Sequence, residues 1–415
     1  MAAFPIEAVR SRFPALSVED GRQPRIYFDA PGGTQVCADA IAAMSAHLTG
    51  GTANAGGAFA TSVATDAMSR EAHAAMADLL GGHPGEIAFG PNMTTLTLSV
   101  SRALAREWRE GDELVVTRLD HDANVAPWLL AAADREMTVR WLDFDPATGA
   151  HRLDQLPALL GSRTRLVAVG GASNALGTLN DVAEVVRIVR DRSDALVFVD
   201  AVQSTPHVPV DVRTLGCDLL AFSPYKMFGP HQGVLWGRAE LLEQLTAYKV
   251  RPASIEPAAE RFETGTPSFE GQAGVLGMIA YLEWLGGTLS SAATTRRARL
   301  LAALEGCIAY EHALGDRLLA GLTRLARVRL YGRQTMDGRL PTFGFTVTGH
   351  EPRQVVRHLA DQGIFAWSGH FYAVETITAL GLEESGGLVR VGLCHYNTVD
   401  EVDRLLAALI ELADA

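Results

Sequence analysis

Short apolar runs alternate with helical patterns from about residue 25 to residue 240 of the chain. Runs such as Leu166–Val169 and Leu196–Val199 are apolar throughout, as in parallel strands that helices cover on both faces. Such alternation is typical of an α/β sheet with right-handed crossovers. Ligands of such sheets bind at the carboxyl ends of the strands, where loops and helix N-termini converge. The expected strands are Arg25–Phe28, Glu86–Phe89, Glu113–Thr117, Val139–Leu142, Arg165–Val169, Leu196–Val199, Leu219–Phe222 and Gly233–Trp236.

The pattern changes beyond a helical stretch over residues 274–325. We predict a large α/β domain over residues 29–290, a smaller α+β C-terminal domain over 291–415, and an N-terminal helix or arm over 1–28 that packs with the small domain. The spacing of a capping box occurs at Asp181 and Glu184 and again, before the last helix, at Thr398 and Glu401. Other expected elements are the helices Ala67–Leu80, Asp181–Arg192 and Pro352–Gln362 and the strands Thr342–Val347 and Leu388–Leu393.

Charge and cysteine usage narrow the class of protein. A net charge of −12 disfavours nucleic acids and anionic membranes as partners, because both bind basic patches. No run reaches the roughly 18 apolar residues of a membrane span, and the segment Phe4–Phe13 has the pattern of an amphipathic helix rather than a signal peptide. The four cysteines form no CxxC pair, so neither a disulfide framework nor a metal site is expected. We therefore expect a cytoplasmic protein.

Lysine occurs at only two positions, Lys226 and Lys249, which leaves 36 − 2 = 34 arginines. An amine can lose its proton and attack a carbonyl carbon, whereas a guanidinium cannot. Lys249 follows a helix-like stretch, and we interpret it as a solvated helix C-terminus. Lys226 directly follows the expected strand Leu219–Phe222 and therefore projects into the expected ligand crevice. On its position alone, Lys226 is equally compatible with a structural role.

An acidic residue, Asp200, ends the preceding expected strand, 226 − 200 = 26 residues before Lys226. A carboxylate at the mouth of an apolar strand is costly unless it faces a cation. A protonated pyridine nitrogen is such a cation, and a carboxylate partner keeps it protonated so that the ring can accept electrons. Gln203 is placed to hydrogen-bond a ring oxygen. Taken alone, Asp200 is also compatible with a helix N-cap.

Several segments resemble class V aminotransferases and, among them, the cysteine desulfurase branch, whose members use pyridoxal 5′-phosphate (PLP). The resemblance covers nearly the whole chain in order. It implies a mainly parallel, seven-stranded-type sheet in a large PLP-binding domain and a smaller α+β C-terminal domain. The segments that carry it are Phe28–Gly32, Thr94–Thr95, Asp120–Trp128, Ala172–Thr178, Val199–Gln203, Cys217–Pro230, Arg261–Pro267 and Arg390–Asn397.

The resemblance implies roles for individual residues in holding the cofactor. Lys226 would bind PLP covalently and move the substrate's α-proton, Asp200 would pair with the pyridine nitrogen, and His121 would stack on the ring. Tyr225 stands where the family usually has a histidine. The other implied contacts are Gln203 and Asn174 at the ring's phenolic oxygen, and Met93, Thr94, Ser223 and Tyr225 at the phosphate.

Further roles concern the substrate and a second subunit. Arg390 matches the arginine that binds the substrate α-carboxylate, for which a planar fork of N–H donors is well suited. Thr266 matches a residue that reaches the phosphate of the neighbouring subunit, which implies a homodimer with shared active sites. Asn54 opens a segment of small residues where desulfurases carry a histidine and basic residues, so we expect Asn54 at a less polar substrate pocket.

Two positions depart from the desulfurase pattern. Tyr372 occupies the place of the cysteine that takes up sulfur as a persulfide, and Trp367 replaces an arginine just upstream. A phenol cannot accept a persulfide sulfur, so we expect Tyr372 to orient the substrate or pass a proton. Cys394 lies near Arg390 in sequence, but the favoured interpretation is a small, buried apolar side chain.

Three functions are compatible with this pattern. The favoured one is C–S bond cleavage by β-elimination from an amino acid, without a persulfide cysteine. The second keeps the cofactor and changes the reaction to transamination, epimerisation or a cyclising step. The third is a non-catalytic scaffold or regulator with the same fold, which the presence of Lys226, Asp200, His121 and Arg390 disfavours.

Overall fold

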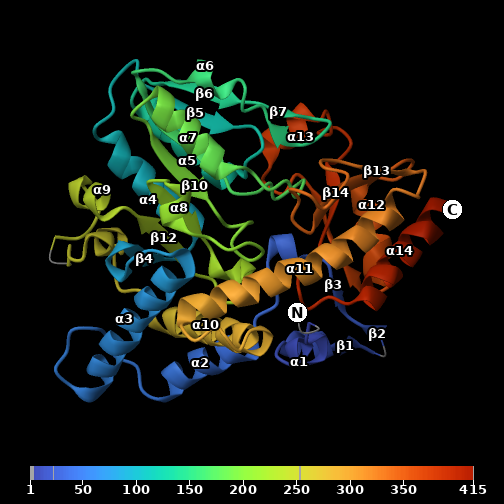
Figure 1. Ribbon diagram of the computed structural model, residues 1–415, viewed down its shortest axis with the longest axis horizontal. Coiled ribbons are helices and arrows are strands. Elements are labelled where there is room, and N and C mark those ends of the chain that lie inside the picture. The colour runs from blue at the N-terminus through green and yellow to red at the C-terminus, as the bar shows by residue number, and fades with distance from the viewer. Residues whose placement is uncertain (1–3, 22, 252–253, 415) are drawn as a thin grey trace.

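The computed structural model describes residues 4–21, 23–251 and 254–414, and its largest feature is a seven-stranded sheet (Figure 1). Only β12 runs antiparallel to its neighbours, β11 and β4, which confirms the mainly parallel sheet. In spatial order the strands are β4 (Ile87–Gly90), β12 (Gly233–Gly237), β11 (Leu219–Phe222), β10 (Leu196–Asp200), β9 (Thr164–Gly170), β5 (Glu113–Thr117) and β6 (Thr138–Leu142).

Both faces of this sheet are buried, as the uninterrupted apolar runs predict. In β9, Val167 and Val169 join one apolar core, whereas Leu166 and Ala168 join the other. This is the alternation of a strand whose successive side chains point to opposite faces. The helices around the two cores are α2 (Ala38–Thr49), α3 (Ala60–Leu80), α4 (Met93–Ala105), α5 (Ala126–Asp134), α6 (Leu156–Leu159), α7 (Val182–Arg192), α8 (Val212–Leu215), α9 (Ala239–Gln244) and α10 (Phe269–Leu289).

A second sheet of four strands lies in the C-terminal part of the chain, in the order β13 (Val328–Leu330), β14 (Thr342–Val347), β17 (Leu388–Gly392) and β16 (Trp367–Gly369). The long helix α11 (Arg296–Leu322) runs from beside α10, below the large sheet in this view, toward α14 in the C-terminal part (Figure 1). At its middle, the buried Glu311 lies 2.8 Å from His207, which follows β10. The other helices of this part are α12 (Pro352–Asp361), α13 (Val374–Ala379) and α14 (Val399–Asp414).

The N-terminal segment packs against the C-terminal part. Strand β3 (Ile26–Tyr27) pairs in parallel with β15 (Ile364–Phe365), and Arg10 forms an ion pair with Glu401. Helix α1 (Ile6–Arg10) is shorter than the expected amphipathic helix, because the chain turns into a 3₁₀ segment at Pro14. The remaining short strands are β1 (Glu19–Asp20), β2 (Gln23–Pro24), β7 (Phe144–Asp145) and β8 (Ala150–His151). The division into an arm, a large domain and a small domain stays a prediction.

The capping motifs have different outcomes. At α14 both bonds of the box form: the Glu401 N–H donates to Thr398 Oγ1, and the Thr398 N–H donates to a Glu401 carboxylate oxygen. At α7 the Asp181 side chain accepts from the Glu184 N–H. Among the described residues, no helix has the length and hydropathy needed to cross a membrane.

Candidate active site

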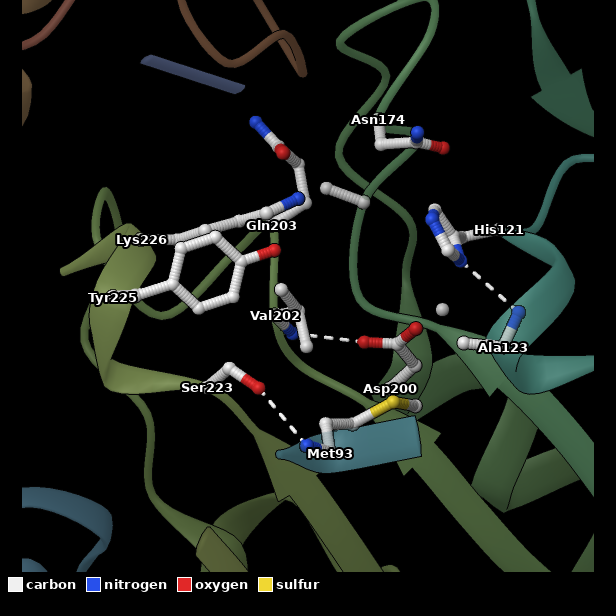
Figure 2. A pocket seen from close by; sticks show the side chains of 12 residues that line it. Met93, His121, Ala123, Asn174, Asp200, Val202, Gln203, Ser223, Tyr225 and Lys226 are labelled. Carbon is white, nitrogen blue, oxygen red and sulfur yellow. Dashed lines mark hydrogen bonds between the residues drawn. The ribbon is translucent and has the colours of Figure 1, made fainter. Parts of the chain in front are cut away.

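The carboxyl ends of four strands of the large sheet converge on one cavity, as expected for an α/β sheet. Asp200 ends β10 and Gly170 ends β9 beside it, while Lys226 and His121 follow β11 and β5. Figure 2 shows Lys226 and Tyr225 on one wall of the cavity and His121 and Asn174 on the opposite wall. The residues that line the cavity are Met93, His121, Ala123, Gly170, Ala172, Asn174, Asp200, Val202, Gln203, Ser223, Tyr225 and Lys226.

Lys226 is held by a 3₁₀ turn, Pro224–Lys226, that begins directly after β11. Its side chain is buried, and burial together with the positive charge of Arg390 lowers the pKa of its amine to about 7. A substantial fraction of this amine is therefore unprotonated near neutral pH. An unprotonated lysine is a nucleophile and a base, which are the two properties that covalent chemistry with a carbonyl needs.

Asp200 supplies the negative charge of the cavity. One carboxylate oxygen accepts a hydrogen bond of 2.9 Å from the Val202 N–H, and burial raises the pKa of the carboxyl to about 6. A second buried carboxyl, Asp120, accepts from the Gly170 N–H and from the Asn124 amide. Burial raises the pKa of Asp120 to about 7, and the charge of Asp200 adds to this shift. Asp120 thus ties the loop that carries His121 to the end of β9.

The His121 ring is neutral in this cavity. Its Nδ1 accepts a hydrogen bond of 3.0 Å from the Ala123 N–H, which leaves Nε2 as the protonated nitrogen. Burial and the positive charge of Lys226 lower the pKa of His121 to about 3. A flat, uncharged ring with a locked tautomer is suited to stacking on an aromatic ligand.

Two buried amides present unpaired oxygens. Gln203 donates its Nε2 to Thr342 Oγ1, and Asn174 donates its Nδ2 to the Phe371 carbonyl, while Gln203 Oε1 and Asn174 Oδ1 have no partner among the described residues. Buried polar atoms are rarely left unpaired in folded proteins. The Thr342 hydroxyl can donate as well as accept, so a rotated Gln203 amide would turn its N–H groups toward the cavity. The cavity is therefore built for a polar ligand.

The start of α4 forms the floor of the cavity. The Met93 N–H donates to Ser223 Oγ at 3.0 Å, and the Thr95 N–H is capped by Asn92. Thr94 is exposed and lies between them, beside the cavity rather than in its lining. Tyr225 stacks on His231 with 4.9 Å between ring centroids. A helix N-terminus with a nearby hydroxyl is suited to binding a phosphate.

Arg390 comes from β17 of the second sheet and is buried. Its Nη1 donates to the Asn174 carbonyl at 2.9 Å, and its guanidinium lies 4.1 Å from the centre of the Phe371 ring. Burial lowers the pKa of Arg390 to about 9, and the nearby Asp29 opposes this shift, so the group stays charged at neutral pH. Burial raises the pKa of Asp29 itself to about 6.

Tyr372 lies on a strained loop at the mouth of the cavity. Phe371 and Tyr372 have φ values of 55° and 58°, a left-handed conformation that side chains other than glycine rarely adopt. The Asp122 N–H donates to the Tyr372 carbonyl at 2.7 Å, while Asn174 binds the Phe371 carbonyl. Tyr372 is 63% exposed, and its ring lies 5.3 Å from the His121 ring.

Comparison with known proteins decides the family. The model of the family described as Aminotransferase class-V matches residues 26–405. The chain belongs to the class-V aminotransferase family. The chain is 34% identical to a probable cysteine desulfurase of Pseudomonas aeruginosa, over 96% of each chain, and 32% identical to the aminotransferase-like protein FGM3 of Gibberella zeae, over 98% of each. A solved structure of a cysteine desulfurase from Thermococcus onnurineus superimposes with a TM-score of 0.87 at 28% identity, covering 100% of both chains.

Class-V aminotransferases are PLP enzymes, and the residues of this cavity fit that cofactor. A buried lysine with a lowered pKa, a buried carboxylate and a neutral imidazole surround a space with unpaired amide oxygens. In this class-V enzyme, Lys226 would hold the cofactor, Asp200 and His121 would face its ring, and Ser223 and the start of α4 would hold its phosphate.

Two predicted site residues lie away from this cavity in the single chain. Thr266 lines a second cavity, together with Ala55 and Gly56, which follow Asn54. Asn54 itself accepts a hydrogen bond from Ser62 through its backbone carbonyl. A role for Thr266 and Asn54 at the active site would require a second subunit, and it stays a prediction.

The cysteines and the second lysine are placed outside the site. Cys394 is fully buried beyond the end of β17, as the favoured interpretation expects, and the three other cysteines are buried as well. The interpretation of Lys249 as a solvated helix C-terminus is wrong. Helix α9 ends earlier, at Gln244, and the Lys249 ammonium donates a hydrogen bond to the Glu260 carbonyl.

Sequence reasoning missed several residues around the site. Phe371 packs on Arg390, His231 packs on Tyr225, and Asp120 anchors the His121 loop. Asp120 directly precedes His121 and Phe371 directly precedes Tyr372, so their positions in the sequence could have indicated that both lie near the site. No signal in the sequence indicated His231, because its partner depends on the turn after Lys226.

Proposed function

We propose that this enzyme is a PLP-dependent C–S lyase that performs β-elimination on an amino acid without a persulfide cysteine. The proposal is carried by the mouth of the cavity, where Tyr372 lies and where the resemblance to desulfurases would put the sulfur-accepting cysteine. All four cysteines are buried, and none of them is among the residues that line the cavity. An elimination needs a base and a leaving group, and it needs no sulfur acceptor on the protein.

The side chains of the chain supply the steps of this reaction. PLP, when bound, supplies an electron sink for the bond that breaks at Cα. Lys226 would take the proton from Cα, since its amine is unprotonated in part at neutral pH. Arg390 would hold the α-carboxylate and thereby present the Cα–H bond to Lys226. The Cβ–S bond then breaks, and the Tyr372 hydroxyl would provide the proton that converts the departing thiolate to a thiol.

Product analysis tests this proposal. The holoenzyme, incubated with L-cysteine and with S-methyl-L-cysteine, should release pyruvate, ammonia and, respectively, sulfide or methanethiol. Transamination would instead yield a keto acid that retains sulfur, with the cofactor recovered as its amine form. Epimerisation would yield the D-amino acid. Either of these two product patterns would overturn the lyase proposal, while the class of cofactor would stand.

We expect the Tyr372→Phe substitution to lower turnover about ten-fold or more, because it removes the only proton-donating group of this side chain. PLP binding should change little, since Tyr372 lies outside the lining of the cofactor cavity. The measurement is steady-state turnover together with a PLP titration. Tyr248→Phe, at an exposed tyrosine remote from the cavity, is the matched control.

The same proposal predicts that no cysteine is essential. Cys394→Ala should retain most of the activity, because Cys394 is not among the residues that line the cavity. Mass spectrometry during turnover should detect no persulfide on the protein. A trapped persulfide, together with an inactive Cys394→Ala variant, would restore the desulfurase mechanism.

We further propose a homodimer with shared active sites. Thr266 and the segment after Asn54 line one open cavity, and α2 and the start of α3 carry exposed apolar side chains such as Ile41, Leu48 and Val63. If Thr266 reaches the phosphate of the partner subunit, dimerisation and PLP retention are linked. Sedimentation at micromolar concentration should give twice the mass of the chain. A monomer that retains PLP as tightly as the dimer would contradict this.

A further inference from the structure

Trp367 and Arg390 form a cross-strand pair, and Arg390 contacts Asn174, one of the residues that line the cavity. Strands β16 and β17 are antiparallel, and their register places Trp367 directly opposite Arg390. Directly opposed residues of an antiparallel pair point their side chains to the same face of the sheet. Arg390 is buried, whereas Trp367 is 53% exposed. The indole therefore lies on the outer side of the guanidinium.

Gly32 lies against the polar ends of both side chains. A Cβ atom added to Gly32 would lie 2.6 Å from Trp367 Nε1 and 3.5 Å from Arg390 Nη2. Gly32 does not have a positive φ, so its backbone conformation is open to other residues. Glycine is required here because a larger side chain would collide with the Trp367 indole. Two N–H donors from neighbouring strands thus lie beside the same glycine.

These donors have no hydrogen-bond partner among the described residues. Arg390 Nη1 is bound to the Asn174 carbonyl and one face of its guanidinium lies on Phe371, while its buried Nε has no partner. The free edge of the guanidinium therefore consists of Nε and Nη2, the two parallel donors that match a carboxylate. No hydrogen bond of the Trp367 indole is found among the described residues, so its N–H is available as well.

We propose that the Trp367 indole N–H is a third donor to the substrate α-carboxylate, beside the Nε–Nη2 edge of Arg390. This rests on the proposed function, in which the substrate is an amino acid. An indole adds a hydrogen bond without adding a positive charge. The site then holds one carboxylate with three donors and carries a single guanidinium charge, which favours substrates whose side chain bears no second carboxylate.

Binding of a substrate that cannot undergo β-elimination tests this assignment. L-Norvaline has no leaving group at Cβ, and L-norvalinamide has the same side chain but no carboxylate. Each is titrated into the holoenzyme, and the change in cofactor absorbance gives a dissociation constant. Trp367→Phe keeps the ring and removes the N–H. We expect it to weaken norvaline binding about ten-fold, as for loss of a hydrogen bond to a charged group, and to leave norvalinamide binding within about two-fold.

Two further variants separate hydrogen bonding from packing. Gly32→Ala places a methyl group between the two donors, and it should weaken norvaline binding in the same selective way. Trp367→Arg returns N–H donors to this position and should restore norvaline binding relative to Trp367→Phe. Trp284→Phe is the matched control, since Trp284 also lies against an arginine, Arg12, but far along the chain from this site.

The outcomes distinguish this inference from the proposed function. Equal weakening of norvaline and norvalinamide by Trp367→Phe would mean that Trp367 acts by packing, and would overturn the inference while the lyase proposal stands. Unchanged norvaline binding would overturn it in the same way. Failure of the unsubstituted holoenzyme to bind norvaline at all would overturn the assignment of an amino-acid substrate, and the inference with it.

Discussion

Replacing Lys226 with alanine or with arginine should abolish turnover, by a factor of roughly a thousand or more, and remove the absorption band of the lysine-bound cofactor. Alanine has no amine, and the guanidinium of arginine stays protonated and cannot attack a carbonyl. Both variants should remain folded: arginine preserves the charge and much of the length of lysine, and alanine is tolerated by the 3₁₀ turn Pro224–Lys226 that carries this position. Absorbance spectra of the purified variants, with and without added PLP, give the result.

Lys249→Arg is the control for this pair, because it changes the only other lysine. The Lys249 ammonium donates to the Glu260 carbonyl, and arginine can make the same hydrogen bond. The control should keep both the absorption band and the activity. A Lys226→Arg variant that turned over as the unsubstituted enzyme does would refute the assignment of Lys226.

The lowered pKa of Lys226 also predicts how the rate of PLP uptake depends on pH. The amine has a pKa of about 7, so it is mostly protonated at pH 6 and mostly neutral at pH 8. Only the neutral form attacks PLP, so the rate at which unloaded protein takes up PLP should rise about ten-fold across this range. Ionisation of Asp200, with a pKa of about 6, acts in the same direction. Stopped-flow absorbance at several pH values measures the rate.

Asp200→Asn should weaken PLP binding by roughly thirty-fold or more and lower turnover further. The substitution keeps the shape of the side chain and an oxygen for the Val202 N–H, but it removes the charge that would face the pyridine nitrogen. Loss of one member of a buried, hydrogen-bonded charge pair costs about 2–5 kcal/mol. Equilibrium dialysis of PLP against the variant measures the loss of affinity.

Asp181→Asn provides the comparison for Asp200→Asn. Asp181 caps α7 by accepting from the Glu184 N–H, and asparagine caps helices about as well as aspartate. The same chemical change should therefore have little effect on PLP affinity at this position. Unchanged PLP affinity in Asp200→Asn would show that the carboxylate does not pair with the cofactor.

The sequence predicted the large sheet well because its strands carry a strong local signal. Leu166–Val169 and Leu196–Val199 are apolar at every position, as expected of parallel strands that are covered on both faces. The antiparallel direction of β12 was not predicted, because direction depends on how the chain turns after Lys226 and not on the residues within the strand. The parallel pair of β3 and β15 joins residues 338 positions apart (Ile26 and Ile364), for which no local pattern exists.

In the candidate site, too, the residues that follow strand ends could be predicted from the sequence, whereas the contacts between the two sheets could not. Lys226, Asp200 and His121 follow strand ends, so the topology alone brings them together. The use of Asn174 was only partly foreseen: its amide binds the Phe371 carbonyl and its own carbonyl binds Arg390. These contacts cross between the two sheets. Their geometry depends on how the sheets pack, which a reading of single segments does not reveal.

The loop that carries Tyr372 is held by hydrogen bonds to its backbone, and this restricts how such an enzyme could gain or lose the ability to transfer sulfur. A sulfur carrier needs a thiol that can swing outward to hand its sulfur to an acceptor. Here the carbonyls of Phe371 and Tyr372 are each bound by the cavity wall. A cysteine engineered at position 372 would sit on a backbone that these two hydrogen bonds hold in place. Conversion into a sulfur donor would therefore require releasing the backbone as well as changing one side chain, so the two traits must evolve together.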